Sequence, residues 1–219
     1  MQKIIYFLFF ISIFSCRPNE PFKQKNNDNQ DNFKTLVKDY ENENRVIWQK
    51  PDLVMNTIGN LENKVVADIG AGTGYFSFRM LPKAKKVIAI DIDKRFINFM
   101  DSIKSQLPES YRNQFESRLA TVSDPKLKDE ETNAVLIVNT YIYIENRVEY
   151  LKILKKGMAP NAKLIIIDFK KKNIPVGPPQ EVKIAESQVE EELTNAGFEN
   201  IQIDEKTLDY QYIVTAFNR

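Results

Sequence analysis

The stretch that decides the fold is VVADIGAGTGYF, which runs from Val65 to Phe76. It begins as a short apolar run and passes directly into three glycines at alternate positions, Gly70, Gly72 and Gly74. Glycines at a strand-to-helix turn let the backbone approach a ligand closely and adopt dihedral angles that are closed to other residues. The stretch therefore predicts a strand, a tight loop against a nucleotide-like ligand, and the start of a helix.

The spacing of the glycines discriminates among nucleotide ligands. A dinucleotide fingerprint places its third glycine three residues after the second, but that position holds Tyr75, which also weakens a nicotinamide dehydrogenase. The Gly-Lys-Ser/Thr ending that holds a triphosphate is absent as well. What remains is a Gly-x-Gly-x-Gly loop preceded by the carboxylate of Asp68.

Further short apolar runs surround this stretch and read as strands. Four of them show no polar alternation, as expected of parallel strands that are covered on both faces, and a fifth, at 119–121, is interpreted as the third strand of the sheet. The four lie at 65–67, 87–90, 134–138 and 164–167. Residues 201–203 and 212–217 read as two closing strands with no room for a helix between them, so the last is predicted to be antiparallel.

Helical patterns alternate with these strands at 75–81, 95–107, 147–156 and 187–196. The last begins with Ser187 and Glu190 at capping-box spacing and ends at Gly197, a suitable left-handed stop. Upstream, apolar residues from Phe33 to Tyr40 recur at helical spacing, and Pro51 suits the first turn of a second helix that Gly59 would end. The predicted fold class is α/β: a doubly wound, mostly parallel seven-stranded sheet with helices on both faces and an antiparallel C-terminal strand.

Asp91 follows the apolar run 87–90, at the tip of the predicted second strand. A carboxylate there can accept two hydrogen bonds from the paired hydroxyls of a ribose beside the glycine loop. The alternative role is a helix cap, for which Asp93 is the better candidate. In Asp68, the three glycines and Asp91, the sequence resembles class I methyltransferases dependent on S-adenosylmethionine, over residues 45–219.

This resemblance implies a Rossmann-like methyltransferase fold and S-adenosylmethionine as the cofactor. Backbone groups of Gly70 and Gly72 would contact the methionyl part, and Gly74 would open the following helix. Asp68 would favour the positive charge of the cofactor, the alternative being a solvated turn aspartate. Asp124 would meet the adenine amine, although a Ser-Asp-Pro turn is also common for local reasons. The remaining implied cofactor contacts are Ala71, Ile92 and Asn139.

The methyl acceptor is expected at the end of the fourth strand, beside Asn139 and Thr140, since open parallel sheets bind ligands there. Methyltransferases acting on base amino groups follow this Asn with two prolines, so Thr140 argues against a nucleic-acid acceptor and leaves a small molecule. In-line displacement needs mainly alignment and exclusion of water. Where the acceptor must lose a proton, the candidate catalytic residues are Asp168, Tyr141 and Tyr143.

Two segments rich in proline or aromatic residues flank the predicted pocket. Residues 175–179, PVGPP, are too rigid for a helix and are candidates to cap the pocket, while residues 48–51, WQKP, would close its other side. The alternative for both is plain connection and core packing.

The overall composition limits the other partners. The 219 residues carry 31 Lys and Arg against 30 Asp and Glu, a net charge of +1 that disfavours nucleic acid. There is no histidine and a single cysteine, Cys16, so neither a disulfide nor a cysteine-built zinc site is expected, and no metal.

The N-terminus resembles a targeting signal. Residues 4–14 form an apolar stretch too short to span a bilayer, and residues 13–16, IFSC, resemble a bacterial lipoprotein processing box ending at Cys16. We expect a signal peptide at 1–15, a lipidated Cys16 with a flexible tether through 32, and a methyltransferase-like domain at 33–219, on the periplasmic or outer-membrane side. One alternative is an uncleaved anchor with the domain in the cytoplasm. Because export would separate the domain from a cytosolic cofactor, another is a lipid-anchored, non-catalytic binding protein.

Overall fold

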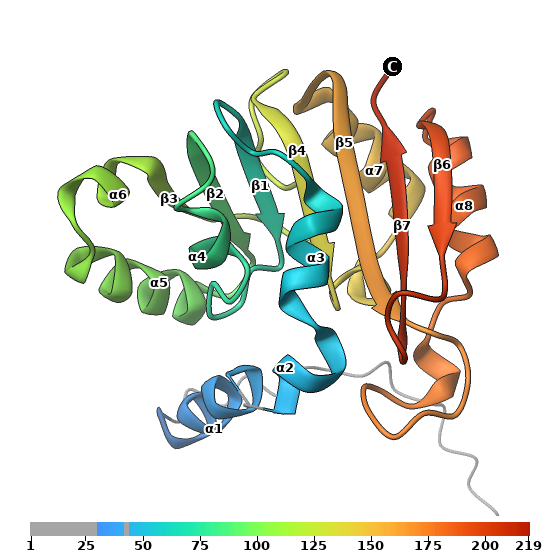
Figure 1. Cartoon of the computed structure of the whole chain (residues 1–219), viewed down its shortest axis with the longest axis horizontal. Helices are drawn as coiled ribbons and strands as arrows, with labels where there is room; N and C mark the ends of the chain where they lie inside the picture. The colour runs from blue at the N-terminus through green and yellow to red at the C-terminus, as the bar shows by residue number, and fades with distance from the viewer. Residues whose placement is uncertain (1–29, 42–43) are drawn as a thin grey trace, which may run out of the picture.

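The computed structural model describes residues 30–41 and 44–219. A seven-stranded sheet runs through the molecule in the order β3-β2-β1-β4-β5-β7-β6 (Figure 1). Its strands are β1 (Val65–Ile69), β2 (Lys86–Asp91), β3 (Phe115–Leu119), β4 (Thr132–Val138), β5 (Met158–Phe169), β6 (Glu199–Asp204) and β7 (Gln211–Phe217). Neighbouring strands from β3 to β5 are parallel, and β7 is antiparallel to both β5 and β6. The predicted fold class is confirmed.

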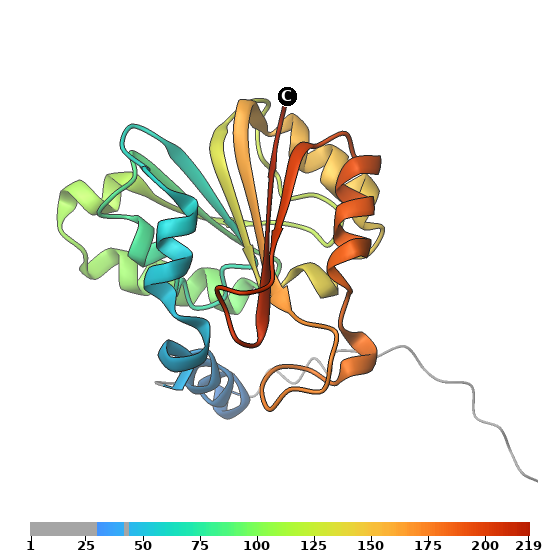
Figure 2. The same cartoon turned by 45° about the vertical axis from the view of Figure 1, so that its right-hand side comes forward.

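Helices cover both faces of this sheet (Figures 1 and 2). They are α1 (Gln30–Tyr40), α2 (Asn44–Gln49), α3 (Pro51–Ile58), α4 (Ser77–Met80), α5 (Lys94–Gln106), α6 (Glu109–Gln114), α7 (Arg147–Lys156) and α8 (Glu186–Asn195), with short 3-10 turns η1 (Tyr141–Tyr143) and η2 (Gln180–Val182). One face carries side chains of α3, α4 and α5, and the other carries α7 and α8. The parallel strands all end at the same edge of the sheet, and α1 and α2 lie at that edge in both views.

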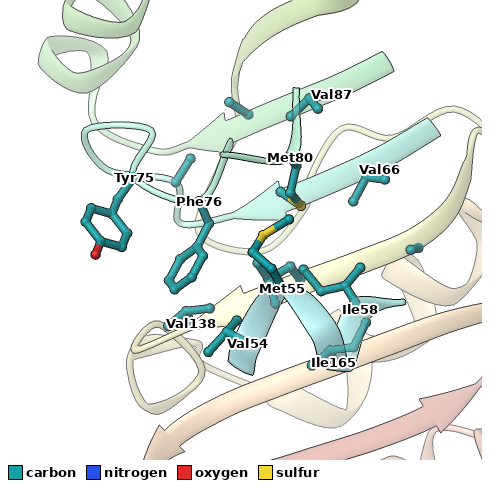
Figure 3. Packing of buried hydrophobic residues seen from close by; sticks show 14 of the residues in the cluster. Val54, Met55, Ile58, Val66, Tyr75, Phe76, Met80, Val87, Val138 and Ile165 are labelled. Carbon is teal, nitrogen blue, oxygen red and sulfur yellow. The ribbon is translucent and has the colours of Figure 1, made fainter. Parts of the chain in front are cut away.

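The central strands are apolar throughout because each of their faces meets a separate hydrophobic cluster. In β4, Leu136 packs into the cluster under α3 and α4, whereas Val135 and Ile137 pack into the cluster under α7 and α8. Figure 3 shows the first cluster, where Met55 and Met80 from the two helices meet above the strands. Burial of each such side chain stabilises the fold by roughly 1.5–3 kcal/mol, which fixes the strand ends that carry the site.

The third strand lies earlier in the chain than the sequence predicted. It spans Phe115–Leu119 rather than 119–121, and Thr121 forms only an isolated bridge with Asp124. This strand is at the edge of the sheet, where only Phe115 is fully buried and where Glu116 forms an ion pair with Lys86 (2.6 Å). An edge strand of mixed polarity does not give a continuous apolar run, and the sequence therefore indicated the wrong segment.

The helix ends agree with the sequence except at one cap. Gly59 and Gly197 stop their helices with φ of 84° and 83°, as predicted, and Pro51 stands in the first turn of α3. The capping box expected from Ser187 does not form, because α8 begins one residue earlier with Ala185 at its N-cap and no side-chain hydrogen bond there.

The N-terminal region also differs at its boundary. Helix α1 begins at Gln30, so residues 30–32 of the expected tether belong to that helix. The predicted signal peptide and Cys16 lie outside the described residues. Within 30–41 and 44–219, every helix is too short or too polar to cross a bilayer.

Candidate functional site

The three glycines form the loop that the sequence predicted, at the edge where the parallel strands end. All three have positive φ, between 56° and 84°, which disfavours other residues there. The N–H groups of Gly70 and Ala71 donate to Ile90 O at 2.8 and 3.0 Å and so hold the loop over β2. A Cβ on Gly70 would clash with the side chain of Thr140, so the loop lies directly against the end of β4.

Asp91 stands at the tip of β2, directly beside the glycine loop. Its Oδ2 accepts from Gly72 N at 2.8 Å and its Oδ1 accepts from Asp93 N at 2.9 Å. Burial raises the pKa of this carboxyl, and the backbone hydrogen bonds oppose that rise. Asp93, and not Asp91, caps α5 by accepting from Arg95 N at 2.8 Å, as the sequence favoured.

Asp68, the second-last residue of β1, is almost completely buried, so it is not a solvated turn residue. Its Oδ2 accepts from the Ser77 hydroxyl at 2.6 Å. Burial raises the pKa of Asp68 to about 6, while the Ser77 hydrogen bond and the charge of Arg45 oppose the rise. The carboxylate is thus poised to gain from a positive charge placed beside it.

Arg45, from α2, is a charged residue of this site that the sequence did not reveal. Its guanidinium lies 4.2 Å from the centre of the Tyr75 ring, its Nη1 donates to Tyr40 O at 3.0 Å, and its Nε donates to Gln49 Oε1. Burial lowers the pKa of Arg45. No local pattern marks this arginine, because the Tyr75 ring beneath its guanidinium comes from the loop after β1.

Helix α1 crosses the glycine loop and places Tyr40 on it. A Cβ on Gly72 would lie 2.8 Å from two carbons of the Tyr40 ring, which is also stacked on Phe96 with centroids 5.2 Å apart. Burial and the nearby charge of Asp91 raise the pKa of Tyr40. The Thr73 hydroxyl donates to Glu41 just beyond the helix. The N-terminal helix therefore occupies space directly above the loop, which the sequence did not predict.

A chain of side-chain amides links Arg45 to the end of β4. Asn139 follows β4 with φ of 54°, and its Oδ1 accepts from Gln211 Nε2. Gln211 Oε1 in turn accepts from Gln49 Nε2 at 3.3 Å, and both glutamines are fully buried. Sequence reasoning identified Asn139 but not its partner Gln211, which lies 72 residues further along the chain, nor Gln49 behind it.

Two of the three candidate catalytic residues lie inside the fold. Asp168 has no exposed surface, and its two oxygens accept from Phe169 N at 2.8 Å and Ile142 N at 3.4 Å. Burial raises its pKa to about 7. Tyr141 is equally buried and donates its hydroxyl to Glu192 at 2.7 Å. Burial, followed by this contact with Glu192, raises the pKa of Tyr141.

Tyr143, the third candidate, is 68% exposed on the turn after β4. Partial burial and the charge of Asp168 raise its pKa. Of the three, it is the side chain that solvent reaches.

Two further cofactor candidates, Ile92 and Asp124, differ in whether they are available to a ligand. Ile92 is 52% exposed directly after Asp91, which leaves an apolar surface for a ligand ring. Asp124 accepts from Lys126 N at 2.7 Å and forms an ion pair with the same residue. Its contacts are those of a local turn.

The two segments expected to flank the pocket both pack on Phe169 at the end of β5. The Trp48 ring lies 5.6 Å from the Phe169 ring, and a Cβ on Gly177 would lie 2.6 Å from carbons of the same ring.

Among the described residues, no group of three or more metal-ligating side chains is gathered together.

Comparisons with known proteins agree with this architecture. Residues 60–216 match the family model described as "Methyltransferase domain". Similar curated proteins include ribosomal RNA small subunit methyltransferase A of Mycoplasmopsis synoviae (32% identical over 44% of this chain) and tRNA U34 carboxymethyltransferase of Nautilia profundicola (29% identical over 49%). The chain matches about a third of the length of each, 35%. A solved S-adenosylmethionine-dependent methyltransferase from Aquifex aeolicus is 24% identical with a TM-score of 0.75, covering 84% of this chain and 98% of that one, a likeness of fold.

Proposed function

This chain belongs to the class I S-adenosylmethionine-dependent methyltransferases, and we propose that it transfers the methyl group to a small-molecule acceptor by in-line displacement. The observation that carries the proposal is the contact between Asp91 and the N–H of Gly72, which joins the ribose-binding acid to the glycine loop. In the proposal, Asp91, Ile92, Asp68 and Arg45 would each contact a different part of the cofactor.

The glycine loop presents backbone instead of side chains to a ligand, and the Tyr40 ring that now lies against Gly72 would have to move for the cofactor to bind. Gly70, Gly72 and Gly74 offer bare backbone, and each oxygen of Asp91 accepts one N–H and has capacity for another hydrogen bond. In the proposal, Asp91 receives the ribose hydroxyls and Ile92 flanks the adenine.

The methionyl end would meet charges of both signs. Asp68 would favour its positive groups, and the guanidinium of Arg45, whose charge acts on Asp68, would pair with its carboxylate. When bound, S-adenosylmethionine supplies a methyl group on a positively charged sulfur. The residues of this chain hold that group in line with the acceptor and exclude water, an arrangement that requires no metal.

A small-molecule acceptor is favoured by the charge balance and by the sequence after β4. The net charge of +1 gives no general attraction for nucleic acid, and Thr140 follows Asn139 where enzymes acting on base amino groups carry proline. The two curated relatives are named for RNA substrates, so RNA belongs in the test.

Isothermal titration of the full-length chain with S-adenosylhomocysteine tests the site. We expect binding that weakens at least tenfold in Asp91→Ala, because buried ribose hydroxyls would lose their acceptor. Asp93→Ala, which removes a neighbouring carboxylate that caps α5 and pairs with Arg95, is the matched control. Equal affinity of the Asp91 variant and the parent would remove the ribose assignment.

Methyl transfer from labelled S-adenosylmethionine to a panel of small molecules and to RNA tests the acceptor. Labelling of small molecules supports the proposal, and labelling of RNA alone contradicts it. The second candidate, a non-catalytic binding protein, is favoured by the burial of Asp168 and Tyr141. Tight binding of S-adenosylhomocysteine without transfer to any acceptor would support that candidate.

A further inference from the structure

The hydrogen bonds from Arg45 to Asn139 have a fixed direction. An arginine only donates, so the Gln49 amide must turn its oxygen toward Arg45 and its nitrogen away. Gln49 then donates to Gln211 Oε1 at 3.3 Å, and Gln211 donates to Asn139 Oδ1. The cation at one end thus determines which atom of the Asn139 amide is used at the other.

The result is an Asn139 amide whose oxygen is occupied and whose nitrogen is free to donate. Within the described parts of the chain, no side chain or backbone group accepts a hydrogen bond from Asn139 Nδ2, and the residue is partly exposed. It follows β4 immediately before Thr140, which touches Gly70 of the glycine loop. A hydrogen-bond donor therefore stands next to the methionyl end of the cofactor site.

From this polarity we infer that the methyl acceptor is an anionic oxygen, a carboxylate or an acidic phenolate, with Gln49 and Gln211 as positioning residues that direct the Asn139 N–H toward it. This inference rests on the proposed function. An amine acceptor needs its lone pair for the methyl group and presents N–H groups to its surroundings, and these would face the N–H of Asn139 without an acceptor. An oxygen anion has one lone pair for the methyl group and another that can accept the N–H of Asn139.

Two of the three candidate bases are inaccessible, which favours an acceptor that needs no base. Asp168 is fully buried with both oxygens engaged by backbone N–H groups, and Tyr141 is bound to Glu192. A carboxylic acid or acidic phenol has already given its proton to water at neutral pH and needs no base. Its oxygen forms a bond to the methyl carbon as the carbon–sulfur bond breaks, and that electron pair stays on sulfur. The products are an ester or ether and neutral S-adenosylhomocysteine.

Neutron diffraction from a deuterated crystal of the protein with S-adenosylhomocysteine tests the polarity directly. We expect deuterons on Gln211 Nε2 that point at Asn139 Oδ1, and deuterons on Asn139 Nδ2 that point away from Gln211. The reverse arrangement, in which Asn139 donates to Gln211, would overturn the inference. Because this readout shows the amides themselves, it does not depend on turnover.

Matched acceptor pairs test the substrate class: benzoate against benzylamine, and 4-nitrophenol against 4-nitroaniline. We expect labelled methyl on the oxygen members only. Transfer to the amines, or to no member of the panel while S-adenosylhomocysteine still binds, would contradict the acceptor class. Failure of S-adenosylhomocysteine to bind at all would instead contradict the proposed function.

Reversal of the amide chain is the sharpest control. A glutamate in Gln211→Glu has no N–H to donate, so Asn139 must turn its nitrogen toward it and present its oxygen to the acceptor. In Gln49→Glu, the new carboxylate pairs with Arg45 and can only accept from Gln211, so the direction of the hydrogen bonds reverses from the other end. This variant replaces the first if Gln211→Glu does not fold. We expect both to lose oxygen methylation by at least tenfold, whereas Gln202→Glu, the same change on the exposed side of β6, retains it. Unchanged oxygen methylation in both reversed variants would exclude the positioning role.

Discussion

At the scale of single residues, the site holds a buried carboxylate, Asp68, and a partly buried cation, Arg45, close enough for their charges to interact. Asp68 has no ion pair of its own within hydrogen-bond distance among the described residues, but the charge of Arg45 acts on it. Arg45 is held by the Tyr75 ring, by Tyr40 O and by Gln49. A ligand that carries both an ammonium and a carboxylate, as the methionyl group does, would satisfy the two side chains together.

We predict that Arg45→Gln weakens the binding of S-adenosylhomocysteine by about 10- to 100-fold, since a hydrogen bond to a charged group contributes about 1.5–3 kcal/mol. Binding of 5′-methylthioadenosine, which lacks the carboxylate, should change less than about threefold. Isothermal titration with both ligands measures the difference. Arg79→Gln is the control, because Arg79 lies on the same Tyr75 ring at 3.6 Å but donates to Tyr75 O. An equal loss for both ligands would mean that Arg45 only supports the fold.

The raised pKa of Asp68, about 6, predicts a pH dependence of cofactor affinity. The ammonium of S-adenosylhomocysteine favours the ionised carboxylate, so below pH 6 binding must displace a proton. The affinity for S-adenosylhomocysteine should therefore be nearly constant above the pKa and fall by about tenfold per pH unit below it. Titration in two buffers of different ionisation enthalpy should detect the proton released. In Asp68→Asn, the dependence over this range should vanish; if it persists, another group titrates.

At the scale of elements, α1 is the part of the molecule that most directly limits access to the glycine loop. The Tyr40 ring touches Gly72, and Phe33 from the same helix lies 5.3 Å from the Phe96 ring. These contacts come from a helix that precedes the matched domain, residues 60–216. A ligand that contacts the backbone of Gly72 must displace the ring of Tyr40.

Tyr40→Ala should therefore tighten the binding of S-adenosylhomocysteine by about fivefold, because displacement of an aromatic pair costs roughly 0.5–1.5 kcal/mol. Tyr40→Phe keeps the ring and its stacking on Phe96, so it should bind like the parent. Calorimetric titration of the three proteins is the measurement. Weaker binding in Tyr40→Ala would show that the ring contacts the ligand instead of competing with it.

At the scale of the whole molecule, the site and the N-terminal helices share one edge of the sheet. The parallel strands end there, and α1 and α2 lie against that edge in both views (Figures 1 and 2). We propose that Cys16 is a lipid attachment point upstream of α1, on the basis of the lipoprotein-like residues 13–16. An anchor at Cys16 would join the domain near the mouth of the site.

The prediction for the anchor is that Cys16→Ser moves the protein from the membrane fraction to the soluble fraction and abolishes labelling with palmitate. Cys16 is the single cysteine, so the variant removes every thiol that could carry the acyl chain. Fractionation of expressing bacteria, with and without globomycin, is the measurement. A variant that stays in the membrane fraction would favour the alternative, an uncleaved apolar anchor.

The sequence by itself determined the central strands of the sheet, the glycine loop after β1 and the acid beside that loop. Asp68, Gly70 and Asp91 could be placed because each lies within a few residues of an apolar run that can only be a buried strand. Backbone preference and hydrophobic periodicity are local properties, so a short window contains them. The edge strand β3 was misplaced because its polar side chains, Glu116 and Arg118, form ion pairs with Lys86 of β2 and with each other and leave no such run.

Only the tertiary structure decided which side chains surround that loop. Gln49 and Gln211 meet although they are 162 residues apart, and Tyr40 reaches Gly72 from a helix outside the sheet. The same packing buries Asp168 under the turn after β4, where sequence reasoning proposed a base. Contacts of this kind depend on how helices and strands pack against one another. The free energy of that packing comes from many residues far apart in the sequence, so no single segment of sequence contains it.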